Sequence, residues 1–188
     1  MTGRILLIVA TVLMAASGLL PAGTLEPLRY ERAAVAAGEW WRLATAHVVH
    51  LGPGHGIMNA AALLLVVWVM RDLRRTATWL WLALASVVTV DAGLYFVFPD
   101  VSWYVGASGA LHGIFAGAAL LTAVRGHRVQ GAAMLVAIAA KLAWEWTTGG
   151  SVSTAAGAGF PVVIESHLLG ACGGVAGALI ILARGLRG

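Results

Sequence analysis

Long apolar stretches separated by short polar segments dominate the pattern of this 188-residue chain. A transmembrane helix needs about 20 mainly apolar residues, with a range of roughly 17–25. Six stretches approach that length, and because lipid offers no water to backbone polar groups, each should be helical. The predicted spans are Ile5–Leu20, Gly56–Met70, Ala77–Phe98, Ser108–Val124, Val129–Trp146 and Val162–Ala183.

The pattern therefore predicts an all-α, polytopic membrane protein, a bundle of six transmembrane helices in a single domain over residues 1–188. We find neither a strand-like alternation nor an internal repeat. Composition agrees, because 60% of the residues are hydrophobic and 11% are charged, against about 25% charged in a typical soluble domain. The net charge of +4 would suit nucleic-acid binding, but the arginines lie in short clusters between apolar stretches. We therefore expect no nucleic-acid partner.

Arginine placement predicts the orientation, because cytoplasmic loops of membrane proteins are enriched in Lys and Arg. If the spans alternate in direction, both termini should be cytoplasmic, and the long loop after the first span should face outward. We expect a multi-pass protein of the bacterial inner (cytoplasmic) membrane. The alternative, that the first span is a cleaved signal peptide, would leave five spans and break the alternation. The arginines on the predicted cytoplasmic side are Arg4, Arg71, Arg74, Arg75, Arg125, Arg128, Arg184 and Arg187.

Polar residues gather at the outward ends of the predicted spans. His55 and Asn59 share one helix face at a spacing of four, Ser108 begins the fourth span, and His167 lies at the start of the sixth. Alone, each has an ordinary structural interpretation as a helix cap or a hydrogen-bonded interface residue. Together they could supply a nucleophile with its base and donors for an oxyanion.

Glycines spaced four residues apart predict which helices pack closely, since small residues let backbones approach in lipid. The fourth span has such a series, and the sixth has two. Close packing of these helices would bring Ser108 and His167 within hydrogen-bond distance. The series are Gly109, Gly113 and Gly117, then Gly170 and Gly174, and finally Gly173 and Gly177.

These motifs resemble the rhomboid family of intramembrane serine proteases. Gly106-Ala107-Ser108-Gly109 is similar to the Gly-x-Ser-Gly nucleophile motif, and His167 with its following glycines is similar to the final His-x-x-Gly-x-x-x-Gly helix. The outer loop and second span add further matches. They are Trp41-Arg42-Leu43, Thr45, His50, and the His-x-x-x-Asn of His55 and Asn59.

The resemblance implies a role for each matching residue. Ser108 would be the nucleophile and His167 the general base, in a dyad without the aspartate of soluble triads. His55, Asn59 and the Ser108 backbone N–H would form the oxyanion hole. Gly106 and Gly109 would support the nucleophile, and Trp41 and Arg42 would shape an outer loop lying partly in the membrane interface.

Some residues depart from the usual family pattern. His112 stands where an aromatic residue commonly stacks on the catalytic histidine, Ser166 stands where alanine is usual, and the fifth span contains Lys141 and Glu145. These features resemble the rhombosortase subfamily, thought to process proteins ending in a Gly-Gly motif, a hydrophobic helix and a basic tail. The resemblance implies cleavage near Gly-Gly, with hydrolysis or transfer of the product to a lipid-derived nucleophile.

The roles of several of these residues stay open at this point. Lys141 and Glu145, spaced by four, could form an intrahelical pair, with a polar floor to the substrate pocket as the alternative. His112 could simply pack on His167, tune that base or hold a water. We expect Asp91 to form a hydrogen bond between helices, and His50 to brace the outer loop with His47.

Two other functional classes fit parts of the sequence. Six histidines could bind zinc or haem, but metal sites need three or four converging ligands, and His47, His50 and His55 have irregular spacings. We therefore expect no metal and no other cofactor. A proteolytically inactive relative that binds membrane helices is disfavoured by the intact Ser108 and His167. The expected partners are the lipid bilayer and a membrane protein substrate with a C-terminal transmembrane helix.

Overall fold

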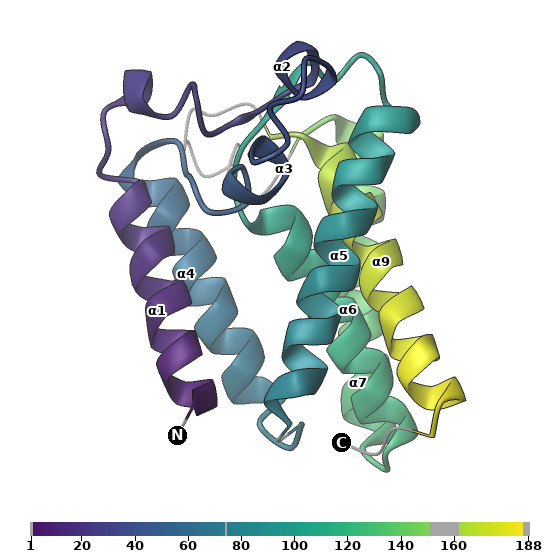
Figure 1. The fold of residues 1–188 in the computed structure, drawn as a ribbon. Helices are drawn as coiled ribbons and strands as arrows, with labels where there is room; N and C mark the ends of the chain where they lie inside the picture. The colour runs from purple at the N-terminus through teal and green to yellow at the C-terminus, as the bar shows by residue number, and fades with distance from the viewer. Residues whose placement is uncertain (1, 74, 151–161, 186–188) are drawn as a thin grey trace.

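Six long helices make up the bundle of this computed structural model, which describes residues 2–73, 75–150 and 162–185 (Figure 1). Each helix corresponds to one predicted span, with ends that differ by at most about one turn. Arg74 and Arg187, used above for orientation, lie outside the described residues. The helices are α1 (Thr2–Ser17), α4 (Gly52–Val69), α5 (Thr76–Phe96), α6 (Ser108–Val124), α7 (Arg128–Thr148) and α9 (Ile164–Ala183).

Not every helix meets the requirements of a membrane span equally. Within the described part of the chain, α4, α5 and α9 are long and apolar enough to cross a bilayer. Helices α1 and α6 are apolar but shorter. Helix α7 is 21 residues long but carries Lys141 and Glu145 in its second half. The described residues therefore form six long helices, and length and composition single out three of these as clear candidate spans.

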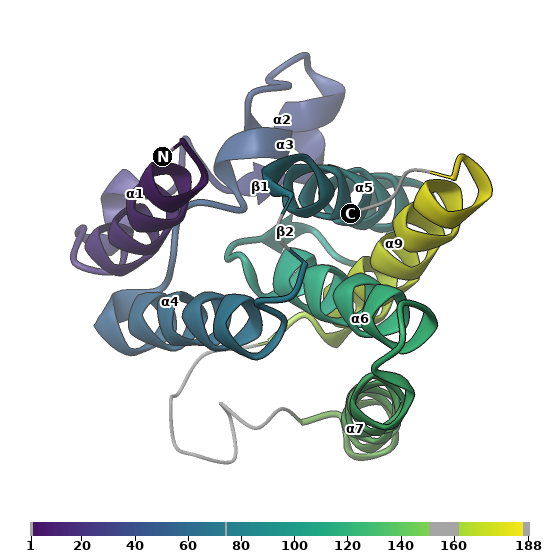
Figure 2. The same cartoon turned by 90° about the horizontal axis from the view of Figure 1, so that it is seen from below.

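Helix α6 lies at the centre of the arrangement, as the view along the bundle shows (Figure 2). It packs most extensively against α9 and also contacts α5 and α7. Helices α1 and α4 pair at one side, whereas α7 lies at the periphery and touches mainly α6. Helix α1 begins and α9 ends at the same end of the bundle (Figure 1), and the Ser108 and His167 ends of α6 and α9 lie at the opposite end.

Glycines let α6 and α9 approach backbone to backbone, as the sequence predicted. A Cβ atom added to Gly170 would overlap the carbonyl oxygen of Gly109, and one added to Gly174 would overlap that of Gly113. The relation is reciprocal, because a Cβ on Gly113 would meet the Gly170 carbonyl. Helix α9 uses its other glycine series against α5, where Gly173 faces the Ala85 carbonyl.

The loop between α1 and α4 covers the end of the bundle opposite the start of α1 (Figure 1). Its β1 pairs with β2 in an antiparallel register of Tyr30 with Tyr104. The expectation of a strand-free chain is wrong here, because two residues per strand are too few to show an alternation. The loop contains η1 (Ala22–Thr24), β1 (Tyr30–Glu31), α2 (Arg32–Ala36) and α3 (Arg42–Thr45), whereas β2 (Trp103–Tyr104) lies between α5 and α6.

Polar side chains fasten this loop to the helices. His47 Nε2 lies 3.0 Å from Asp91 Oδ1 of α5, so the partner of Asp91 is a loop residue rather than the second helix we expected. The Arg32 guanidinium donates to the carbonyl of Tyr95 near the end of α5, at 2.7 and 2.8 Å. The loop is therefore held at a defined position over the bundle.

The glycine contacts predict the effect of one added methyl group. Gly174→Ala should push α9 away from α6 and destabilise the protein by about 1–3 kcal/mol, the usual cost of overpacking. Thermal unfolding in detergent measures the change. Gly54→Ala is the matched control, because Gly54 lies in α4 with no atom within 4 Å of its added Cβ. Equal midpoints for wild type and Gly174→Ala would contradict the account of the packing.

Candidate active site

Ser108 and His167 meet at the loop-covered end of the bundle. Ser108 is the first residue of α6, and His167 lies in the first turn of α9. His167 Nε2 is 3.0 Å from Ser108 Oγ. Because the close approach of α6 and α9 sets the separation of their ends, this contact follows from the glycine faces. The geometry lets the Ser108 hydroxyl donate to an unprotonated Nε2.

The other ring nitrogen of His167 has a carboxylate partner. Nδ1 lies 2.9 Å from Glu145 Oε2 of α7, and a carboxylate can only accept, so Nδ1 carries the proton. A neutral ring then has its lone pair on Nε2, toward Ser108. The Ser108–His167 pair thus has a third side chain in contact with it, Glu145. The sequence analysis did not predict this contact, because a spacing of four residues predicts the pairing within α7 and gives no signal for a contact with another helix.

Lys141 and His112 complete the surroundings of that carboxylate. Lys141 Nζ lies 2.6 Å from Glu145 Oε1, as the predicted intrahelical pair requires, and 2.8 Å from His112 Nε2. His112 Nδ1 is 2.7 Å from the carbonyl oxygen of Ser108. The His112 ring stacks on His167 with centroids 4.0 Å apart, so it occupies the stacking position that the resemblance assigns to an aromatic residue.

His55 and Gly106 lie together beside the start of α6. A Cβ atom at Gly106 would come within 2.8 Å of His55 Nε2, and the glycine adopts a φ of +110°. Both the close approach and the backbone conformation therefore require glycine at this position. The Leu51 backbone N–H donates to His55 Nδ1 at 3.3 Å. That bond leaves the proton on His55 Nε2, the nitrogen facing Gly106.

Asn59 places an amide donor in the same region. Its Nδ2 atom is buried and has no hydrogen-bond partner within the described structure. The same atom lies 3.7 Å from the Cβ position built on Gly106. A buried donor without a partner is costly and calls for an explanation. One explanation is that the partner is a group that arrives only with a substrate.

His50 supports the backbone just before the nucleophile. The Ala107 N–H donates to His50 Nε2 at 3.3 Å, and His50 Nδ1 lies 2.9 Å from the Val48 carbonyl oxygen. Burial, followed by the nearby His55, lowers the pKa of His50 to about 4. The ring is therefore neutral at physiological pH and keeps Nε2 as an acceptor.

Tyr104 is a supporting residue that the sequence analysis missed. Its hydroxyl donates to the carbonyl oxygen of Gly106, and the side chain is 2% exposed. Burial raises the pKa of Tyr104, so the hydroxyl keeps its proton. The position of Tyr104 two residues before Gly106 was the available signal, but a tyrosine next to a membrane interface has many other uses.

Trp41 and Arg42 lie in the outer loop rather than beside Ser108. Arg42 is buried, and its guanidinium donates to the carbonyls of Glu26 at 2.5 Å and Arg29 at 2.9 Å. The Trp41 ring is 53% exposed and donates through Nε1 to Pro27 at 3.1 Å. These contacts tie segments of the loop to one another and leave about half of the Trp41 surface exposed.

The donor set beside His167 fits an ammonium group better than a metal ion. Among the described residues, ligand atoms of His112, Glu145 and His167 lie within 4.8 Å of one another. However, the Lys141 ammonium already contacts the Glu145 carboxylate and His112 Nε2. His167 uses both ring nitrogens for Glu145 and Ser108. Two further histidines have hydrogen-bond partners outside this cluster: His47 contacts Asp91, and His50 accepts from the Ala107 N–H.

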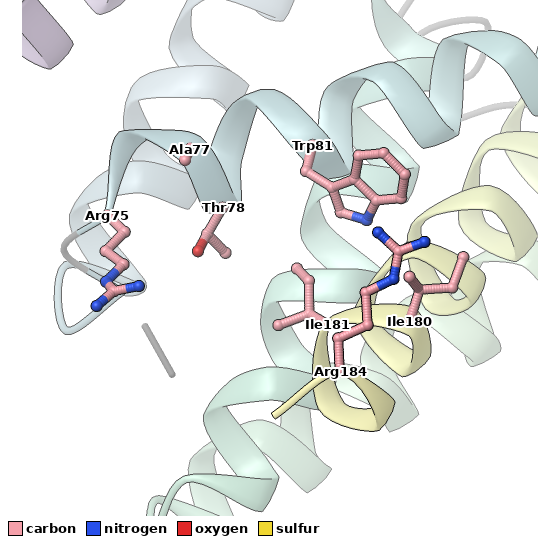
Figure 3. A pocket seen from close by; sticks show the side chains of 7 residues that line it. All are labelled: Arg75, Ala77, Thr78, Trp81, Ile180, Ile181 and Arg184. Atoms are coloured by element: carbon pink, nitrogen blue, oxygen red, sulfur yellow. The ribbon is translucent and has the colours of Figure 1, made fainter. Parts of the chain in front are cut away.

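A separate hollow of about 290 Å³ lies between the start of α5 and the end of α9, at the end of the bundle opposite Ser108 (Figure 3). Its walls combine two arginines and one threonine hydroxyl with apolar side chains. No nucleophile with an adjacent base is present among them, so the hollow has no part in the chemistry considered above. The lining residues are Arg75, Ala77, Thr78, Trp81, Ile180, Ile181 and Arg184.

Comparison with known proteins identifies the family. The rhomboid domain family model matches residues 37–184. The putative rhomboid protease YdcA of Bacillus subtilis is 35% identical over 81 residues, or 43% of this chain and 41% of YdcA. The rhomboid protease GluP of the same organism is 33% identical over 99 residues, or 53% of this chain and 19% of GluP.

These alignments span less than half the length of either relative, and no solved structure matches the chain. The family match nevertheless extends over most of the sequence and includes both Ser108 and His167. The chain therefore belongs to the rhomboid family and is a multi-pass integral membrane protein.

Proposed function

We propose that this protein is an intramembrane serine protease in which Ser108 is the nucleophile and His167 the general base. The observation that carries the proposal is the 3.0 Å contact between Ser108 Oγ and His167 Nε2. Serine is a weak nucleophile until a base accepts its proton, and Nε2 is the unprotonated nitrogen of that ring. The similarity to the two Bacillus subtilis proteins, which are named as rhomboid proteases, also supports proteolysis.

The oxyanion hole in this proposal consists of three donors. The Ser108 N–H belongs to the first turn of α6, which has no side-chain cap, so the helix N-terminus favours negative charge there. Asn59 supplies the buried amide without a partner, and His55 supplies its protonated Nε2. Such preorganised donors stabilise a tetrahedral oxyanion more than a planar carbonyl.

The reaction then proceeds by acyl transfer. Ser108 Oγ bonds to the scissile carbonyl carbon while its proton passes to His167 Nε2, and the carbonyl oxygen becomes the oxyanion. The C–N bond breaks as His167 returns the proton to the leaving amine. Water, or an amine acceptor, attacks the acyl-enzyme in the same way, with His167 again accepting the proton and Ser108 recovering it.

The substrate in this proposal is a membrane protein with a C-terminal transmembrane helix preceded by Gly-Gly and followed by a basic tail. The resemblance to rhombosortases through His112, Lys141, Glu145 and Ser166 supports this choice. Glycine also loosens a helix by about 1 kcal/mol per residue, which helps to expose a scissile carbonyl. There are two alternatives to this function. The first is a rhomboid protease without a sorting role, and the second is a non-proteolytic relative that binds membrane helices.

The same proposal places the active site at the outer face of a bacterial inner membrane. Arginine clusters at the end of the bundle opposite Ser108 support this orientation, which puts both termini in the cytoplasm. The tail of the substrate would then be cytoplasmic and its Gly-Gly motif external. Cleavage would release the external part from its membrane anchor.

Ser108→Ala tests the reaction and the substrate together. A membrane-anchored reporter with Gly-Gly, an apolar helix and a basic tail is co-expressed with each form, and products are identified by mass spectrometry. Wild type should cleave at or near Gly-Gly, and Ser108→Ala should not, because no nucleophile remains. The product mass distinguishes hydrolysis from transfer to an acceptor.

Other outcomes of this experiment would each discard a defined part of the proposal. Cleavage of a generic rhomboid substrate but not of the Gly-Gly reporter would keep the protease and remove the sorting role. Equal cleavage by Ser108→Ala and wild type would show that Ser108 is not the nucleophile. Replacing Gly-Gly by Leu-Leu in the reporter is the matched substrate control.

Asn59→Ala tests the oxyanion hole. Loss of one oxyanion donor typically costs about 10²–10³-fold in kcat, and we expect a decrease of that order here. The thermal midpoint should change little, because Asn59 Nδ2 makes no hydrogen bond within the described structure that the variant would lose. Initial rates and thermal unfolding of purified protein measure both effects. Undiminished kcat in a folded Asn59→Ala protein would exclude Asn59 from the hole.

A further inference from the structure

Helix α7 buries a carboxylate and almost nothing else. Its buried residues are Gly131 and Glu145. Gly131 is explained by packing, because an added Cβ would meet backbone atoms of Ala119 and Ala123 in α6. Glu145 is 1% exposed and is therefore the single fully buried side chain of a peripheral helix. Burying a carboxylate is costly unless charge and hydrogen bonds compensate it.

Both carboxylate oxygens of Glu145 are compensated, and by different elements. Oε2 accepts from His167 Nδ1 at 2.9 Å, and Oε1 accepts from Lys141 Nζ at 2.6 Å. Lys141 also donates to His112 Nε2 at 2.8 Å, and His112 Nδ1 donates to the Ser108 carbonyl at 2.7 Å. The contacts form a closed circuit through α6, α7 and α9 around the Ser108–His167 pair.

An intrahelical ion pair alone does not explain this arrangement. Such a pair at a helix surface contributes little to stability and would leave both groups exposed at that surface. Here the Lys141 side chain is 30% exposed and that of Glu145 1%. The carboxylate is thus turned inward, and the group it meets there is the ring of His167, itself 4% exposed.

We propose that Glu145 is a positioning residue that completes a Ser108–His167–Glu145 relay, and that Lys141 and His112 hold this relay in alignment. The inference rests on the proposed function, since it assigns the control of His167 within the same reaction. It also distinguishes this chain from a protease that operates with a serine and a histidine alone.

The relay acts by fixing which nitrogen of His167 carries a proton. With Nδ1–H held by Glu145, Nε2 stays free to accept the Ser108 proton, and the ring cannot turn over without losing a hydrogen bond to a charged group. When His167 becomes an imidazolium, the Glu145 carboxylate stabilises the positive charge without accepting the proton.

Lys141 and His112 keep the two central groups in place. Lys141 engages Oε1, so that the carboxylate cannot rotate freely away from Nδ1. His112 bonds to both Lys141 and the Ser108 carbonyl, and its ring lies nearly parallel to that of His167, at 15°. The stack restricts tilting of the His167 ring, whose Nε2 lies 3.0 Å from Ser108 Oγ.

Glu145→Gln tests the relay in the full-length protein purified in detergent. The amide lacks the charge and can present an N–H to Nδ1, which would favour the wrong tautomer. We expect kcat to fall by up to about 10⁴-fold, the loss seen when the same change is made in a soluble serine-protease triad, while KM changes little. Glu31→Gln is the matched control, because Glu31 forms an equally short ion pair with Arg29 at 2.6 Å outside the site.

A ¹⁵N spectrum of the histidine rings supplies a readout that a merely structural role would not move. Wild type should show His167 protonated at Nδ1, and Glu145→Gln should shift the ring toward protonation at Nε2. Assignment uses the signals that disappear in His167→Asn. An Nδ1–H signal that is the same in both proteins would overturn the relay, as would a kcat of Glu145→Gln equal to wild type.

A double variant guards against loss of folding. Lys141→Met combined with Glu145→Gln removes both charges, so that no unpaired ammonium is left beside the site. Its kcat should stay as low as that of Glu145→Gln, although its thermal midpoint recovers. Recovery of wild-type kcat in the double variant would mean that Glu145 only neutralises Lys141, and the proposal would be wrong.

Two substitutions of His112 separate stacking from hydrogen bonding. His112→Phe keeps a ring over His167 and should retain a larger share of kcat than His112→Ala, which removes both interactions. Equal rates for the two variants would exclude the stack as an aligning element. Ser108→Ala in the same assay distinguishes the two levels of inference: if it abolishes cleavage while Glu145→Gln does not, the protease stands and the relay fails.

Discussion

The contact of α6 with α9, backbone against backbone, is the constraint on which the candidate active site depends. Ser108 and His167 begin these two helices, so their separation is set by how closely the helix axes approach. Glycine at Gly109, Gly113, Gly170 and Gly174 permits an approach that any side chain would prevent. In a lipid environment, where apolar burial does not drive helices together, such van der Waals contact is a main source of association.

Around this contact, hydrogen bonds fix the protonation state and orientation of most polar side chains. The hydrogen bonds of His50, His55, His112 and His167 assign each ring nitrogen a role as donor or acceptor. The carboxylate of Glu145 and the ammonium of Lys141 balance one another's charge. Asn59 is different, because its amide donor is buried and has no hydrogen-bond partner among the residues that the structure describes. An ordered site with one unsatisfied donor is suited to receive a developing negative charge.

Much of the fold was predictable, because apolar length is a strong signal for helices in membranes. The six stretches became six helices, and the glycine series identified the pair that packs most closely. The boundaries of the loop elements were not predictable. The two-residue strands around Tyr30 and Tyr104 are too short to leave a pattern, and the partner of Asp91 came from a loop whose path depends on tertiary contacts.

The candidate site was predictable in part for the same reason. The approach of Ser108 to His167 could be predicted, because sequence motifs and glycine series lie on the two helices that carry these residues. The contact of Glu145 with His167 does not, because it depends on the rotation of α7 relative to α9, and few residues of α7 are buried to reveal that rotation in the sequence. A lysine four residues before the glutamate suggested a pair within one helix. That pair is present, yet it uses only one of the two carboxylate oxygens.

Labelling with a fluorophosphonate tests most directly the claim that His167 activates Ser108. Purified protein is treated with the reagent in detergent, and the modified residue is located by mass spectrometry, with His167→Ala treated in parallel. The account predicts a covalent adduct on Ser108 in the wild type and strongly reduced labelling in His167→Ala. Equal labelling of Ser108 in both proteins, or an adduct formed only on another residue, would contradict it.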